Sequence, residues 1–152
     1  VSNKRLVNTL RAPELLRTIA FNSSGELLAA AGMGGLVSVW DVATGELRHS
    51  LQLAPSSSPV ANLFVWDVAF SPQGDLLAAA VGDGRLHLWH VGQAVNQAET
   101  RQEFPFLTVD AHRRAVTCLA FSPDGHTLAS GSLDTSVRLW SVEELVRLEP
   151  LQ

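Results

Sequence analysis

The chain consists of short apolar runs separated by turn-forming residues. In the clearest stretch, runs at 116–121, 127–130 and 137–142 are separated by Ser122-Pro123-Asp124-Gly125 and by the Gly/Ser/Asp-rich segment 131–136. Proline presets φ, aspartate can bond its own backbone and glycine accepts positive φ, so both separators predict turns. Such runs are typical of strands in a meander, whereas a helix needs a longer apolar period without breakers.

The same pattern occurs three times, in segments 19–42, 68–91 and 119–142. The spacing from the phenylalanine to the tryptophan is 19 residues in every copy, and the copies begin 49 and then 51 residues apart. The anchors are Phe21/Phe70/Phe121, Gly25/Gly74/Gly125, Leu28/Leu77/Leu128 and Trp40/Trp89/Trp140. A fixed internal frame with variable connections indicates a repeat architecture.

A fourth apolar run follows each of the first two copies, at 46–53 and 102–109. Four antiparallel strands per repeat predict the blade of a β-propeller. We therefore expect one partial propeller over residues 1–152, in which residues 1–11, with Leu6, Val7 and Leu10, form the outer strand of a preceding blade. The expected blades cover residues 12–53, 54–109 and 110–152.

Two signals compete after the third copy. Ser141 and Glu144 form a capping box, which is typical of a helix start. The repeat pattern instead favours an outer strand around residues 145–148, because the first two copies have a strand at that point. We expect the strand.

The frame resembles the WD repeat (WD40) family over nearly the whole chain. Ala111-His112 stands where that family has Gly-His, and Ser130, Asp134 and Trp140 match the other members of its side-chain network. The resemblance implies an all-β partial propeller of three four-stranded antiparallel blades plus a leading outer strand. It also implies that these four side chains bond in series, with the indole N–H as a buried donor that needs a partner.

The first two copies depart from this network. The second has Asp83 and Trp89 but Ala79 in place of the serine, and the first has Ala30 and Gly34 beside Trp40. We expect these blades to rely more on packing.

Charge and cysteine content exclude several classes. The net charge is −4, and the basic pairs Lys4-Arg5 and Arg113-Arg114 are the longest cationic runs, which disfavours nucleic-acid binding. No apolar stretch of 18 residues exists to cross a membrane. Cys118 is the single cysteine, so no disulfide framework exists, and we expect a small buried thiol. A cytoplasmic location is the expectation.

No catalytic, cofactor-binding or metal-binding set emerges. Gly-x-Ser-x-Gly and HExxH motifs are absent. His112, Ser130 and Asp134 resemble a catalytic triad on paper, but a serine between strands is buried. The glycines at 32–35 precede a strand and not a helix, which indicates a hairpin turn. His87 and His90 are three apart on a strand, so they face opposite sides and cannot share a metal.

Three blades leave two apolar flanks open, whereas closed rings contain about four to eight blades. The chain also begins with Val1 and not with methionine. We expect it to be a segment of a longer chain, whose remaining blades cover the flanks. The alternative is a second copy that completes a six-bladed ring.

Because the strands of a blade are packed within and between sheets, we expect the functional residues in the loops. The resemblance implies a non-catalytic scaffold that binds proteins or peptides on its narrow top face. The candidate partner-binding residues are Arg113, Arg114, Asn62, Phe64, Met33 and Leu133. Arginine and aromatic residues often dominate interface energies, although the two arginines could equally be solvated. The alternatives are a segment of a propeller-containing hydrolase and a self-assembling structural unit.

Overall fold

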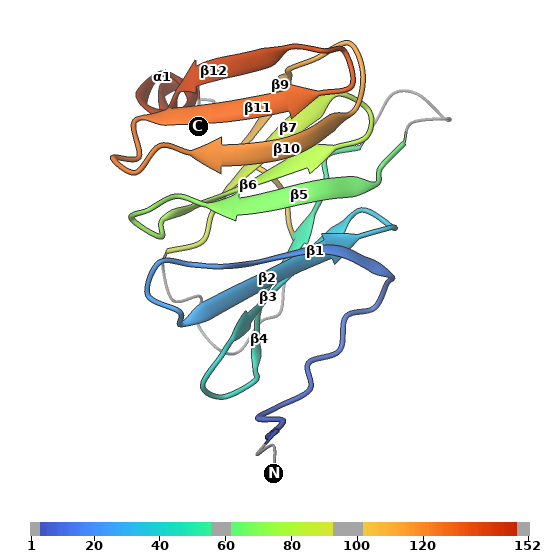
Figure 1. Ribbon diagram of the computed structural model, residues 1–152, viewed down its shortest axis with the longest axis vertical. Coiled ribbons are helices and arrows are strands. Elements are labelled where there is room, and N and C mark those ends of the chain that lie inside the picture. Colours follow the sequence, from blue (N-terminus) through green and yellow to red (C-terminus); the bar gives the residue numbers. More distant parts are fainter. Residues whose placement is uncertain (1–3, 56–61, 93–101, 149–152) are drawn as a thin grey trace.

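The computed structural model describes residues 4–55, 62–92 and 102–148. Three mostly antiparallel sheets lie side by side, and we call them blades one, two and three in chain order (Figure 1). Blade one contains β1 (Leu16–Phe21), β2 (Leu27–Gly32), β3 (Leu36–Asp41) and β4 (Leu47–Gln52). Blade two contains β5 (Val65–Phe70), β6 (Leu76–Val81), β7 (Arg85–His90) and β9 (Leu107–Asp110). Blade three contains β10 (Val116–Phe121), β11 (Thr127–Ser132) and β12 (Val137–Ser141).

The predicted all-β fold with three sheets is confirmed, and local chemistry explains its regularity. The first turn of every blade has a glycine with positive φ, of 76° at Gly25, 78° at Gly74 and 76° at Gly125. L-residues rarely adopt this conformation, so the glycine fixes where the first strand ends and the second begins. The predicted glycine turn between β2 and β3 is also present, with φ of 81° at Gly35.

The first strands of the three blades, which we call the inner strands, pack side by side, with β5 between β1 and β10. Each of these strands has a bulge at the same place, where the pairing register shifts around Arg17, Trp66 and Thr117. A bulge turns the extra residue out of the regular alternation and redirects its side chain. The repeated bulge therefore places the side chains of Arg17, Trp66 and Thr117 at equivalent positions along the first strands of the three blades.

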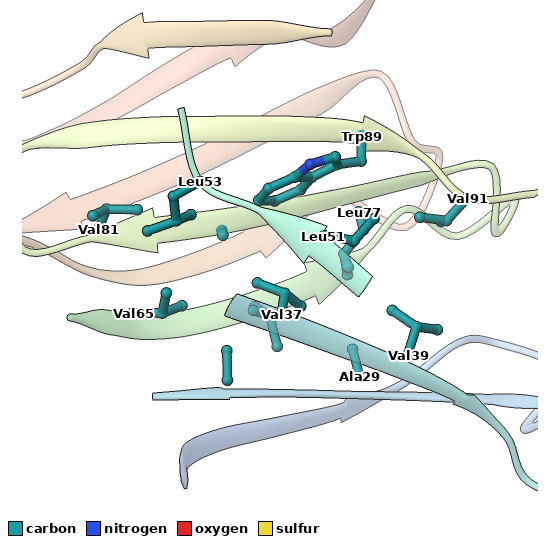
Figure 2. Packing of buried hydrophobic residues seen from close by; sticks show 13 residues of the cluster. Ala29, Val37, Val39, Leu51, Leu53, Val65, Leu77, Val81, Trp89 and Val91 are labelled. Atoms are coloured by element: carbon teal, nitrogen blue, oxygen red, sulfur yellow. The ribbon is translucent and has the colours of Figure 1, made fainter. Parts of the chain in front are cut away.

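Two apolar clusters join the blades. One contains Ala29, Val37 and Val39 of blade one together with Leu77 and Trp89 of blade two. Figure 2 shows Trp89 and Leu77 facing these blade-one side chains. The second cluster joins residues of β6 and β7 to blade three and includes Ala78, Leu86, Leu88, Val116 and Leu128. Blade two is packed on both faces, and all six residues of β6 are buried.

The outer element of blade three is a helix, so the predicted strand at 145–148 was wrong. Helix α1 (Val142–Arg147) begins at Ser141, whose side chain accepts a hydrogen bond from the backbone N–H of Glu144. The buried Leu145 anchors it to the second apolar cluster. The local capping signal prevailed over the repeat pattern because one apolar side chain and a cap suffice to hold a short helix here. No helix within the described ranges is long and apolar enough to span a membrane.

The predicted fourth run of blade two is divided between two sheets. Only β9 pairs with β7 in blade two. The short strand β8 (Gln102–Glu103) instead pairs in parallel with β4 of blade one. Strand β8, which precedes β9 in the chain, thus links the sheets of blades one and two.

The predicted leading strand does not form in the described residues 4–11, where Leu6 is 79% and Val7 89% exposed. A strand needs a neighbouring edge, and within the described residues no third strand of a preceding blade exists to provide one. Cys118 is exposed, which contradicts the expected buried thiol. It belongs to the flank of blade three that also exposes Val137 and Leu139, at 72% and 71%.

Candidate functional site: a buried polar network beneath the top face

Four side chains of blade three form a continuous hydrogen-bonded series. The ring of His112 lies 2.9 Å from Asp134 through Nδ1 and 2.8 Å from the hydroxyl of Ser130 through Nε2. The indole N–H of Trp140 donates to the same hydroxyl over 2.9 Å. Ser130 is fully buried, so each of these bonds replaces water that cannot reach the site. The series ties the loop before β10 to β11 and β12.

Asp134 anchors this series through several donors. The hydroxyl of Ser136, above all, together with its backbone N–H, the His112 ring and the backbone N–H of Arg113, holds the pKa of Asp134 well below its usual range. The carboxylate therefore stays ionised at neutral pH and fixes Nδ1 of His112 as a donor. Nε2 is then the acceptor for the serine hydroxyl.

The connectivity from Ser130 through His112 to Asp134 matches that of a catalytic triad. The surroundings differ from those of a nucleophile. Ser130 has no exposed surface, and its oxygen already accepts the indole N–H of Trp140. A nucleophilic serine needs an open side toward a substrate carbonyl, and this one has none. Within the described residues, no group of three His, Cys, Asp or Glu side chains could hold a metal ion.

The top face comprises the loops that precede β1, β5 and β10 and the turns β2–β3, β6–β7 and β11–β12, on the right in Figure 1. One backbone bond recurs in every blade: Met33 N–H donates to Leu15, Gly82 to Phe64 and Leu133 to Ala115. Turn and loop are thus joined in each repeat. The structure places all six candidate partner-binding residues on this face: Met33, Asn62, Phe64, Arg113, Arg114 and Leu133.

Exposure on the top face is uneven. Met33 is 50% and Leu133 49% exposed, although both are large and apolar. Arg113 and Arg114 are exposed, and Phe64 is half-buried. Exposed apolar side chains at equivalent turns, together with two cations in the loop before β10, are the composition expected of an interaction surface.

The opposite, bottom face contains a hollow of about 550 Å³ whose lining includes Asp41, Arg48 and His49. These three side chains are already paired. Arg48 bonds Asp41 over 3.0 Å, and His49 Nδ1 lies 2.7 Å from Glu103. A ligand would have to displace these contacts, so the top face is the better candidate.

A sequence-family model confirms the repeat frame. The model "WD domain, G-beta repeat" matches residues 4–41, 55–90 and 104–141, which is more than half of the chain. The chain belongs to the WD40 repeat family.

Individual relatives agree with this membership. The chain is 32% identical to WD repeat-containing protein 18 of Bos taurus over 116 residues, which is 76% of this chain and 26% of the relative. It is 60% identical to a Notchless protein homolog of Arabidopsis thaliana over 35 residues, 23% of this chain and 7% of that relative. Striatin-4 of Homo sapiens is 43% identical over 54 residues, 36% of this chain and 7% of the relative. The chain spans at most about a quarter of these relatives.

The second WD40 repeat has other polar contacts in place of the incomplete network. In blade two, Asp83 pairs with Arg85 over 2.6 Å, and the indole N–H of Trp89 donates to the carbonyl of Glu103 over 3.3 Å. The carboxylate of Glu103 also contacts His49 of blade one, so this residue of β8 forms hydrogen bonds with both blades. Alanines at 30 and 79 replace the serine and are buried.

Asp67 is the residue of this WD40 stack that sequence reasoning missed. Its carboxylate accepts hydrogen bonds from the Thr18 hydroxyl over 3.2 Å and from the Leu119 backbone N–H over 2.9 Å. It also accepts the N–H of Val68 in its own strand, over 2.9 Å. One side chain thereby joins β1, β5 and β10. Asp67 is the charged residue of the otherwise apolar strand β5, and this was the signal in the sequence that could have revealed it.

Replacement of Ser130 by alanine is expected to destabilise the chain by about 1–3 kcal/mol, because the donor of Trp140 and the acceptor of His112 would both be buried without a partner. Urea denaturation measures this loss. A double-mutant cycle with Trp140→Phe is expected to show coupling between the two residues. Purely additive losses would contradict a shared network.

We expect His87 to make the stability of this WD40 repeat pH-dependent. Burial, and to a smaller extent the nearby Arg85, lower the pKa of His87 to about 3. The unfolded chain takes up this proton near pH 6.5. Stability is therefore complete above pH 6.5 and decreases as the pH falls toward 3, by about 2 kcal/mol at pH 5.

Urea denaturation at pH 7.5 and pH 5 tests this expectation in the wild type and in His87→Leu. The variant retains every other histidine, so the difference between the two pH dependences isolates His87. We expect a smaller loss of stability at pH 5 in the variant. Identical pH dependences would show that His87 is not held neutral.

Proposed function

We propose that this chain is a non-catalytic protein-interaction module that binds protein or peptide partners through its top face, within a larger scaffold or regulatory assembly. Family membership supports this, since WD40 domains generally mediate protein interactions. The observation that carries it is the pair Met33 and Leu133, two large apolar side chains about half exposed at equivalent turns of different blades. Apolar exposure at fixed, equivalent points favours a recognition surface.

The buried network argues against the hydrolase alternative. Ser130 is enclosed, and its hydroxyl accepts the indole N–H of Trp140 and donates to Nε2 of His112. We infer that the triad-like set is structural. Ser130→Ala should then lower stability while no esterase or peptidase activity is gained or lost.

The open flanks favour one further association. Ile19 and Phe21 on blade one are 64% and 60% exposed, and Val137 and Leu139 on blade three are exposed further still. Further blades of a longer chain, or a second copy, would cover these flanks. Light scattering separates the two: a discrete dimer favours the second copy, whereas a monomer favours further blades.

Peptide display tests the module directly. Peptides selected on the immobilised chain are expected to bind Met33→Ser/Leu133→Ser at least about tenfold more weakly than the wild type, because truncation removes the apolar contacts. Leu148→Ser is the matched control, since Leu148 is 64% exposed but follows α1, away from the top face. If the control variant loses as much affinity, or the double variant loses none, the top face is not the binding surface.

A further inference from the structure

We propose that the top face binds an acidic protein segment that also contributes an aromatic or apolar side chain. The cluster that would bind it, here the cationic–aromatic cluster, comprises Arg17, Phe64, Trp66, Arg113 and Arg114. This inference rests on the proposed function and specifies the chemistry of the partner.

The repeated bulges build the aromatic half of the cluster. Arg17 and Trp66 occupy equivalent bulge positions in β1 and β5. The guanidinium carbon of Arg17 lies 5.5 Å from the centroid of the Trp66 ring, and the Phe64 ring lies 5.2 Å from it on centroids. The indole N–H of Trp66 is buried and bonds no acceptor within the described residues. Packing against Arg17 and Phe64, and not hydrogen bonding, therefore positions this ring.

The cations of the cluster have no carboxylate partner. Arg48, Arg85 and Arg147 each pair with an aspartate or glutamate. The guanidinium groups of Arg17, Arg113 and Arg114 pair with no carboxylate in the part of the chain that the structure describes. A cation over an aromatic face still has its outer side open to an anion.

Within the described residues, the carboxylates near the top face form no ion pair with the arginines of the cluster. Asp134 is bonded to Ser136 and His112, and Asp83 to Arg85. Glu14 bonds the backbone at Leu36 and Gly32, and desolvation by burial raises its pKa. The chain has a net charge of −4, yet this part of its surface presents unpaired arginines. Guanidinium groups without a carboxylate partner are complementary to an acidic ligand.

The two halves of the cluster are connected through the turn of blade two. A Cβ atom at Gly84 would lie 2.4 Å from the carbonyl oxygen of His112 and 3.1 Å from that of Arg114, so the loop before β10 rests on this turn. On its other side, Gly82 donates its N–H to the carbonyl of Phe64 over 2.8 Å. Backbone contact thus runs from Arg114 to Phe64 without a gap.

This arrangement sets the chemistry of the ligand. Guanidinium groups bind carboxylates through two parallel hydrogen bonds, and the ring faces of Phe64 and Trp66 accept a flat or apolar side chain. Nucleic acid would offer phosphates and bases to the same groups. The net charge of −4 repels a nucleic acid, with one charge on every phosphate, more strongly than a short acidic segment with few charges, which favours a protein ligand.

Fluorescence anisotropy with defined probes tests the proposal. The acidic probe is a labelled peptide of alternating glutamate and phenylalanine, the neutral probe replaces each glutamate by glutamine, and oligo-dT serves as the phosphate probe. We expect the chain to bind the acidic peptide at least about tenfold more tightly than the neutral one at about 50 mM NaCl, with the preference shrinking at about 300 mM as charges are screened.

Variants locate the binding. Arg113→Gln/Arg114→Gln is expected to weaken binding of the acidic peptide by about tenfold, and Arg17→Gln by about threefold. Each loss is partial because each arginine contributes only part of the electrostatic attraction. The matched control is Arg147→Gln, which removes an arginine that is also exposed but lies on α1. It should bind as the wild type does. Circular dichroism and thermal melting verify that each variant is folded.

The possible outcomes separate this inference from the proposed function. Equal binding of acidic and neutral peptides, with both weakened by Phe64→Ala, would refute the acidic preference and leave the interaction module intact. An equal loss in Arg147→Gln, or oligo-dT binding as tight as peptide binding, would refute the acidic-segment site. Failure of every peptide, including those selected by display, would refute both.

Discussion

Replacement of Trp89 by alanine is expected to destabilise the chain by about 3–5 kcal/mol, the range typical of a large aromatic side chain removed from a packed core. Trp89 is 2% exposed and is among the largest of the most deeply buried side chains in the described structure. It lies in the cluster that joins blades one and two (Figure 2). The loss should therefore affect both blades together.

Two variants control this prediction in urea denaturation. Trp89→Phe keeps most of the buried ring and loses the hydrogen bond to Glu103, so it should cost clearly less than alanine. Leu139→Ala truncates an apolar side chain that is 71% exposed and should change stability by less than about 0.5 kcal/mol. Similar losses in Trp89→Ala and Leu139→Ala would contradict the packing described here.

Replacement of Asp67 by alanine is the second large expected effect, about 2–3 kcal/mol. It removes the acceptor of Leu119 N–H and of the Thr18 hydroxyl together, and hydrogen bonds to a charged group are stronger than neutral ones. Because these donors belong to blades three and one, the loss should loosen the inner strands of all three blades.

A double-mutant cycle separates this role from a local effect. Thr18→Val removes one donor, and the coupling with Asp67→Ala measures the bond between blades one and two. Asp67→Asn keeps the shape and an oxygen acceptor, so it should retain part of the stability. An Asp67→Ala variant as stable as the wild type would show that the three bonds do not hold the blades.

The strands within each repeat could be predicted almost to the residue. The run expected at 116–121 is β10, and the one expected at 46–53 contains β4. Turn glycines and apolar runs act over a few residues, so the sequence states them locally. The network of His112, Ser130, Asp134 and Trp140 came from the family resemblance, because its members are up to 28 residues apart.

What the sequence did not reveal depends on contacts between repeats. Glu103 meets His49 from 54 residues away, and Asp67 meets Leu119 from 52 residues away. Neither pair lies within one repeat frame, so no local pattern indicates it. The split of 102–109 between β8 and β9 has the same origin, since β8 finds its partner in the neighbouring blade.

The outer element of blade three shows the opposite case, in which local chemistry was the better guide. Ser141 and Glu144 indicated a helix, and the repeat pattern indicated a strand. A strand there would have needed β12 as its partner over several residues. The helix needed only its cap and the burial of Leu145.

Residue-resolved native-state hydrogen exchange provides the sharpest check on a stack of three blades with blade two at its centre. We expect the amides of β6 and β7, which are packed on both faces, to exchange only through global unfolding. The amides of the top-face loops, such as that of Arg114, should exchange far faster, as should those on the open edge of β12. If the amides of β6 exchange as fast as those of the loops, the apolar flanks are not shared between blades. The assignment of function to the loops of the top face would then also fail.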